Sequence, residues 1–150
     1  MPTIQIPTDF KEFLQLLNSN EVEYLLVGGY AVSAHGYPRP TGDMDIWVAR
    51  NSVNAGRIAK ALREFGFSAT SAVDCLFLEE NRVVQLGIPP MRIDILMSVS
   101  GIDFGPCFAK RSVREIDGVT VNLICRDDLI ANKRASGRHK DLDDLQNLPS

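Results

Sequence analysis

The sequence contains little of what marks a secreted or membrane-embedded protein. Its three cysteines are odd in number and far apart, with neither disulfide-framework nor metal-site spacing. We therefore expect reduced thiols in a cytoplasmic protein, at Cys75, Cys107 and Cys125. No apolar run approaches the roughly 18 residues that span a bilayer, and the N-terminal segment lacks the pattern of a signal peptide. We therefore expect no contact with a membrane.

Positive charge is also scarce. The chain carries 16 Lys and Arg against 19 Asp and Glu, which gives a net charge of −3. This balance excludes nonspecific attraction to nucleic-acid phosphates as the main activity. One local basic cluster is present, formed by Arg134, Arg138, His139 and Lys140. It either faces an RNA or nucleotide acceptor or forms a solvated surface.

What is present is the composition of an ordinary folded domain, with 45% apolar and 23% charged residues over positions 1–150. Hydrophobic periodicity predicts helices near residues 10–17, 30–35, 52–65, 126–136 and 140–148, the first with a capping box at Asp9 and Glu12. It predicts strands over residues 24–27, 43–48, 83–88, 91–97 and 119–124. Residues 98–109 are rich in glycine and turn formers, so we expect a loop. Helices and strands mix without strict alternation, which favours an α+β (or α/β) fold with a mixed sheet flanked by helices.

Two carboxylates lie close together on one predicted strand. Asp43 and Asp45 are two positions apart, so their side chains point to the same face, about 7 Å apart along the strand. Met44 and Ile46 then point into the core. Two neighbouring carboxylates repel each other and lose hydration free energy when buried. A divalent cation relieves both costs, and oxygen ligands suit Mg²⁺ or Mn²⁺.

Asp94 interrupts a second apolar run, residues 91–97. If its strand lies beside that of Asp43 and Asp45, the three carboxylates meet, as a two-metal phosphoryl-transfer site requires. The alternative is that these aspartates merely face solvent on an edge strand.

Gly28 and Gly29 follow the first apolar run and open a helix. Glycine lets backbone amides approach a ligand closely, so this turn is a candidate phosphate cradle. The alternative is a tight turn without a ligand. The stretch is neither a P-loop nor a dinucleotide-binding fingerprint, because the required Lys-Ser/Thr and GxGxxG patterns are absent.

Four further side chains are candidates around these motifs. Arg39 either binds phosphate or braces the aspartates, and Thr41 caps or hydrogen-bonds the loop. For His35 we favour a structural role, because no nucleophile is paired with it. Lys133 shares a helix face with apolar residues, so it requires an anion or a cleft, and Asp141 could pair with it or with Arg138. The alternative is a solvated helix pair.

The segment GGYA at 28–31 and the segment RPTGDMD at 39–45, followed by Asp94, resemble the DNA polymerase beta-type nucleotidyltransferase superfamily. The closer resemblance is to small prokaryotic members that occur in toxin–antitoxin and abortive-infection systems. It covers residues 24–148. One departure is Gly29, where many members have a serine whose hydroxyl contacts phosphate.

The resemblance implies a mixed-sheet core that binds an NTP, such as ATP, and transfers its nucleoside monophosphate to a hydroxyl acceptor with release of pyrophosphate. It implies that Asp43 and Asp45 hold Mg²⁺ (or Mn²⁺), that Asp94 completes the second metal site and helps to activate the acceptor, and that the nucleotide is bound by Gly28, Gly29, Arg39, Thr41 and Lys133. The acceptor would be an RNA, a protein or a small molecule.

Two other functions stay open. One is a non-catalytic nucleotide-binding regulator, half of a toxin–antitoxin-like pair, working with a partner protein or as a homo-oligomer. The other is a metal-dependent phosphohydrolase or nuclease that uses the same carboxylates with water as the acceptor.

Overall fold

The protein is described by a computed structural model that covers residues 4–39, 41–67, 77–88 and 91–149. Cys75 and the Pro89-Pro90 junction lie outside these residues. The helices are α1 (Thr8–Ser19), α2 (Gly28–Ala34), α3 (Ser52–Phe65), α5 (Phe104–Ala109), α6 (Arg126–Ser136) and α7 (His139–Asn147). The strands are β1 (Tyr24–Val27), β2 (Met44–Val48), β3 (Val83–Ile88), β4 (Met91–Leu96), β5 (Ser112–Ile116) and β6 (Val119–Leu123).

The six strands form one mixed sheet in the order β3-β4-β2-β1-β6-β5. β1 is antiparallel to β2 and parallel to β6, and β2 is parallel to β4. β3 is antiparallel to β4. The fold is therefore α+β with a mixed sheet, as predicted.

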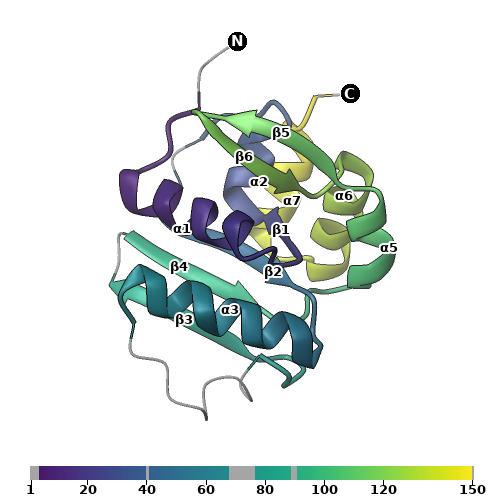
Figure 1. Cartoon of the computed structure of the whole chain (residues 1–150). Coiled ribbons are helices and arrows are strands. Elements are labelled where there is room, and N and C mark those ends of the chain that lie inside the picture. Colours follow the sequence, from purple (N-terminus) through teal and green to yellow (C-terminus); the bar gives the residue numbers. More distant parts are fainter. Residues whose placement is uncertain (1–3, 40, 68–76, 89–90, 150) are drawn as a thin grey trace.

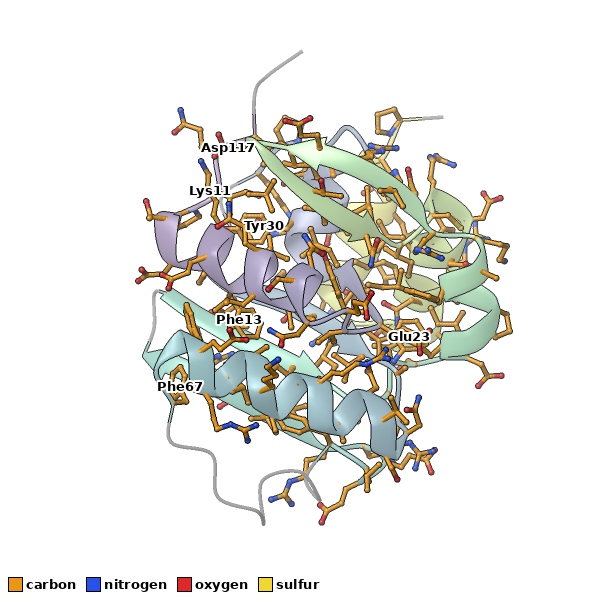
Figure 2. The ribbon with its side chains drawn as sticks, viewed as in Figure 1. Lys11, Phe13, Glu23, Tyr30, Phe67 and Asp117 are labelled. Atoms are coloured by element: carbon orange, nitrogen blue, oxygen red, sulfur yellow. The ribbon has the colours of Figure 1, made fainter. Side chains whose placement is uncertain are left out.

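Helices cover both faces of this sheet (Figure 1). α1 and α3 lie on the face nearest the viewer, and α2, α6 and α7 lie behind it. Between α1 and α3, the rings of Phe13 and Phe65 pack with their centroids 5.2 Å apart, and Figure 2 shows Phe13 at this junction. Met44 and Ile46 are buried as predicted, at 1% and 0% exposure. Since side chains alternate along β2, Asp45 faces the opposite helical layer.

Two segments differ from the prediction. Residues 104–109 form α5 within the expected loop, because Phe104 and Phe108 stack and Phe104 also packs against the ring of Trp47, with centroids 5.3 and 5.2 Å apart. β5 was missed because it is a largely exposed edge strand that buries only Ile116 among its five residues. An edge strand needs no alternating apolar pattern, so it leaves little signal in the sequence.

The ends of the helices are capped in different ways. The side chain of Asn51 accepts a hydrogen bond from the Asn54 amide at the start of α3, and Gly66 ends that helix with a left-handed backbone. The expected capping box at α1 is wrong, because the helix begins after Pro7, without a side-chain cap. α2 begins two residues earlier than predicted, at Gly28. Within the described residues, no helix combines the length and the apolar character needed to cross a bilayer.

Candidate active site

Asp45 lies on β2, an inner strand of the sheet. One neighbour, β1, leads into the glycine turn, and the other, β4, carries Asp94. In the register of β2, Asp45 is opposite Val27 on β1 and opposite Asp94 on β4. Asp43 lies one residue before β2 begins. The strands that carry Asp45 and Asp94 are therefore adjacent, which is the condition that the sequence analysis left open, and the carboxylates of β2 and β4 meet beside the Gly28-Gly29 turn.

Arg92 is a member of this cluster that the sequence analysis did not single out. Its Nη2 donates to Asp43 Oδ2 at 2.9 Å and to Asp94 Oδ2 at 3.1 Å, and its Nε donates to Asp94 Oδ1 at 2.8 Å. These bonds raise the pKa of Arg92, with the hydrogen bond to Asp94 as the largest cause. The available signal was its position two residues before Asp94 on one strand, which places both side chains on one face.

Asp45 differs from the other two aspartates. Among the described residues, no cation forms an ion pair with Asp45, whereas Arg92 bridges Asp43 and Asp94. Burial, followed by the negative charges of Asp94 and Asp43, raises the pKa of Asp45 from 3.8 to about 6. Ionisation of Asp45 therefore costs free energy, because it adds a buried negative charge beside those of Asp94 and Asp43.

The two glycines leave room for neighbouring side chains. A Cβ at Gly28, whose φ is +69°, would lie 2.1 Å from Asp45 Oδ2. A Cβ at Gly29 would lie 2.8 Å from Cγ2 of Thr41 and 3.3 Å from Nη2 of Arg39. Real Cβ atoms essentially never make contacts below 3.0 Å, so larger residues would displace Asp45 and Thr41. The turn therefore requires glycine in order to place these side chains against it.

Lys133 reaches the site from α6 and lies in a buried network of ion pairs with α7. Its Nζ is 2.9 Å from Asp141 Oδ1 and 3.0 Å from Asp144 Oδ2. Arg39 joins the network through two bonds to Asp144, at 2.8 and 2.9 Å. Asp141 also accepts a bond from Arg138 at 2.8 Å, so it pairs with both of its predicted partners. The network connects α6, α7 and the segment before β2.

Hydrogen bonds in this network offset the cost of burying its acids. Burial acts to raise the pKa of Asp144, but bonds from Arg39 and Lys133 outweigh it, so the pKa is lowered. Asp141 follows the same pattern, with bonds from Arg138 and Lys133 lowering its pKa against burial. Both aspartates are about 1% exposed. They therefore remain charged and hold their cations in place.

The remaining predicted residues lie at the edge of the cluster. Thr41 Oγ1 donates to the carbonyl of Arg39 at 3.3 Å, which is the predicted loop hydrogen bond. His35 Nε2 donates to the Ile124 carbonyl at 2.7 Å, which agrees with a structural role. Burial lowers the pKa of His35 and favours its neutral form. Phosphate binding by Arg39, Thr41 and Lys133 stays a prediction.

The donor chemistry of the site suits a divalent cation. Carboxylate oxygens are hard ligands, and no cation among the described residues forms an ion pair with Asp45. Among the described residues, no group of three acidic, histidine or cysteine side chains is already arranged around one metal position. The guanidinium of Arg92 instead binds two of the three carboxylates. A cation held by Asp43, Asp45 and Asp94 would supply positive charge to phosphate oxygens, and its binding requires Arg92 to release at least one partner.

Arg92 should therefore compete with a metal ion. We expect Arg92→Gln to strengthen Mg²⁺ binding by roughly tenfold, because no guanidinium has to be displaced. In EDTA the same variant should melt at a lower temperature than the wild type, because three carboxylates then repel without a counter-charge. Isothermal titration with Mg²⁺ and thermal melts measure the two effects. Arg82→Gln is the matched control, because Arg82 pairs with Glu79 outside the site. Weaker Mg²⁺ binding in Arg92→Gln would show that the arginine supports the metal site.

Solved structures with this fold include nucleotidyltransferase-like proteins. A Thermotoga maritima protein, provisionally described as a nucleotidyltransferase, aligns with a TM-score of 0.62 and 16% identity, over 91% of this chain and 88% of that one. An antigenic nucleotidyltransferase-like protein from Paracoccidioides brasiliensis aligns with a TM-score of 0.52 and 18% identity, over 92% of this chain and 72% of that one. At these identities the likeness shows the fold. No curated protein sequence matches the chain.

The sequence itself matches one protein family over almost its whole length. The match runs from residue 8 to residue 148 and therefore includes the glycine turn, the three aspartates and the α6–α7 network. The superfamily resemblance drawn from the GGYA and RPTGDMD segments is thereby confirmed. The chain belongs to the family described as "Nucleotidyltransferase of unknown function (DUF6036)".

Proposed function

We propose that this protein is an Mg²⁺- or Mn²⁺-dependent enzyme that transfers a nucleoside monophosphate from an NTP, such as ATP, to a hydroxyl acceptor. The observation that carries the proposal is the register that places Asp45 opposite Asp94, beside the turn at Gly28 and Gly29. Carboxylates that converge at a glycine turn suit a reaction whose catalysis consists mostly of positioning and charge stabilisation. The acceptor is an RNA end, a protein side chain or a small molecule.

In the proposed reaction, the acceptor oxygen forms a bond to the α-phosphorus of the NTP. The bond between that phosphorus and the bridging oxygen breaks, and its electron pair leaves with pyrophosphate. Asp94 lies beside Asp45 on the neighbouring strand and accepts the proton of the acceptor hydroxyl once Arg92 releases one of its oxygens. Asp43, Asp45 and Asp94 would hold the metal ions, which would supply positive charge to the phosphates.

The proposal is tested by transfer of label from an NTP labelled at its α-phosphate. We expect labelled product with Mg²⁺ and at least one NTP when RNA, the protein itself and small hydroxyl compounds are offered as acceptors. Asp43→Asn should reduce transfer by at least about a hundredfold, because it removes a ligand charge. Asp9→Asn changes an exposed aspartate on α1 and should leave transfer unchanged.

The absence of labelled product with all four NTPs and every acceptor class would contradict the proposal. Release of free nucleotide without an adduct would instead indicate hydrolysis with water as the acceptor.

A regulatory nucleotide-binding function is the second candidate, and Arg92 favours it. A guanidinium bound to Asp43 and Asp94 stabilises the cluster without a metal ion. NTP binding without turnover, together with co-purification of a partner protein, would distinguish this function from transfer.

A further inference from the structure

Two clefts meet at the candidate site. The larger has a volume of about 420 Å³ and is bordered by Gly28, Lys133 and Arg138, together with residues 98–100. The smaller has a volume of about 200 Å³ and is bordered by Arg39, Thr41 and Asp43. The larger falls within the size range of small-molecule sites, whereas the smaller admits only one end of a ligand.

Only three described residues line both clefts, namely Gly29, Asp45 and Lys140. Gly29 has no side chain, and Asp45 carries a negative charge. Lys140 is therefore the cation at the boundary between the two clefts. It also lowers the pKa of Asp45 against burial and against the neighbouring carboxylates, and it is the leading cation that does so.

The other cations of the site are bound to carboxylates. Arg39 is bonded to Asp144, Lys133 to Asp141 and Asp144, Arg92 to Asp43 and Asp94, and Arg138 to Asp141. Among the described residues, Lys140 has no such ion pair, and it is exposed at the start of α7. A phosphate that enters the clefts can therefore bind Lys140 without breaking an existing ion pair.

In-line transfer explains why one residue should lie on the boundary between two clefts. The attacking and leaving oxygens lie on opposite sides of the transferred phosphorus, so acceptor and leaving group occupy opposite sides of it. We infer that the larger cleft receives the nucleotide, that the smaller receives the hydroxyl-bearing end of the acceptor, and that Lys140 contacts the transferred α-phosphate between them. This inference rests on the proposed nucleotidyl transfer and assigns a further substrate-contacting residue to it.

Binding measurements separate this inference from the catalytic proposal. The probes are the α,β-methylene analogues of ATP, GTP, CTP and UTP, the corresponding monophosphates, and pyrophosphate, each with Mg²⁺. For any nucleotide that the wild type binds, we expect Lys140→Ala to weaken the binding of the triphosphate analogue and of the monophosphate alike, by roughly tenfold. The affinity for pyrophosphate, which has no α-phosphate, should fall by less than twofold. Lys140→Arg should recover most of the lost affinity because it keeps the charge.

The control is Lys60→Ala, which removes an exposed lysine from α3, on the opposite face of the sheet. It should change none of the affinities. Equal affinities in Lys140→Ala and the wild type would overturn the inference, and so would a loss confined to pyrophosphate. Nucleotide binding that depends on Lys140 without any label transfer would support Lys140 while contradicting the enzymatic proposal. A wild type that binds none of the nucleotides would overturn both.

Discussion

Replacing Lys133 with methionine should lower the free energy of unfolding by about 3–5 kcal/mol, because it leaves two buried carboxylates without their shared cation. The side chain of Lys133 is 5% exposed, and those of Asp141 and Asp144 are each 1% exposed. The three charges are therefore largely shielded from solvent. Arg39 and Arg138 remain bonded to one carboxylate each, so the network is weakened at its centre rather than removed.

Urea denaturation measures this loss, with Lys11→Met as the matched control. Lys11 pairs with Asp117 at 3.1 Å, but both side chains are about a third exposed, and Figure 2 shows the pair at the periphery of the fold. Exposed pairs contribute little to stability, so the control should lose far less than Lys133→Met. Similar losses in the two variants would show that the buried network contributes no more than a surface ion pair.

The buried ion pairs of Lys133 with Asp141 and Asp144 also make the stability of the folded protein depend on pH in the acid range. Asp141 and Asp144 have pKa values held below 3.8 in the folded state, against burial, by their hydrogen bonds. Their stabilisation is therefore fully present above the unfolded pKa and is lost as the pH falls below it. Lys133→Met should remove part of this acid dependence, because it removes a cation that lowers both pKa values.

Asp45→Asn should have opposite effects on activity and stability. Label transfer should fall by about a thousandfold, because the central carboxylate of the cluster is lost. In EDTA the same variant should be more stable than the wild type at neutral pH, by about 1–3 kcal/mol. The physical reason is that ionised Asp45 is partly buried among like charges, which raises its pKa to about 6.

The pH dependence of this stabilisation follows from the direction of the shift. A raised folded-state pKa means that ionised Asp45 destabilises the protein above about pH 6, and that protonation relieves this penalty as the pH falls toward 3.8. The stability advantage of Asp45→Asn should therefore be largest at neutral pH and disappear near pH 4. Asp43→Asn is the comparison, because Asp43 is 40% exposed and paired with Arg92. A destabilised Asp45→Asn protein would show that Asp45 is a structural acceptor.

Mg²⁺ should narrow the difference in stability between Asp45→Asn and the wild type. A cation bound to the aspartates stabilises only the folded wild type, by an amount that rises with its concentration. The melting temperature of the wild type should therefore increase with Mg²⁺, while that of Asp45→Asn changes much less. This comparison detects the metal site without any assumption about the acceptor.

Local patterns predicted the elements that carry the site. The spacing of Asp43 and Asp45 predicted a strand over 43–48, and β2 carries Asp45 but begins one residue after Asp43, while the glycines at 28 and 29 marked the turn that follows β1. Each of these inferences needs only the periodicity of a strand or the backbone freedom of glycine. The same reasoning failed for β5 and α5, where packing against distant residues replaces an apolar pattern.

Charge pairing was the least predictable part. Lys133 was recognised as a lysine on an inward face, but its two partners come from the next helix, and one of them also binds Arg39. The bridge from Arg92 to Asp43 joins residues 49 positions apart. Such pairs depend on which helices and strands become neighbours and on which charges are buried together. Neither follows from the local periodicity of apolar residues in the sequence.

The sequence by itself determined which chemical groups are present: two aspartates two positions apart, a third within another apolar run, a glycine turn, and too little positive charge for general nucleic-acid binding. These are local properties of side-chain type and period. The tertiary structure decided that β2 lies beside β4, so that Asp45 meets Asp94. It also decided that, among the residues that the structure describes, most cations of the site are bound by carboxylates while Lys140 is not. The reason is that like charges on neighbouring strands and buried acids must find counter-charges, and only the folded chain brings those groups within reach.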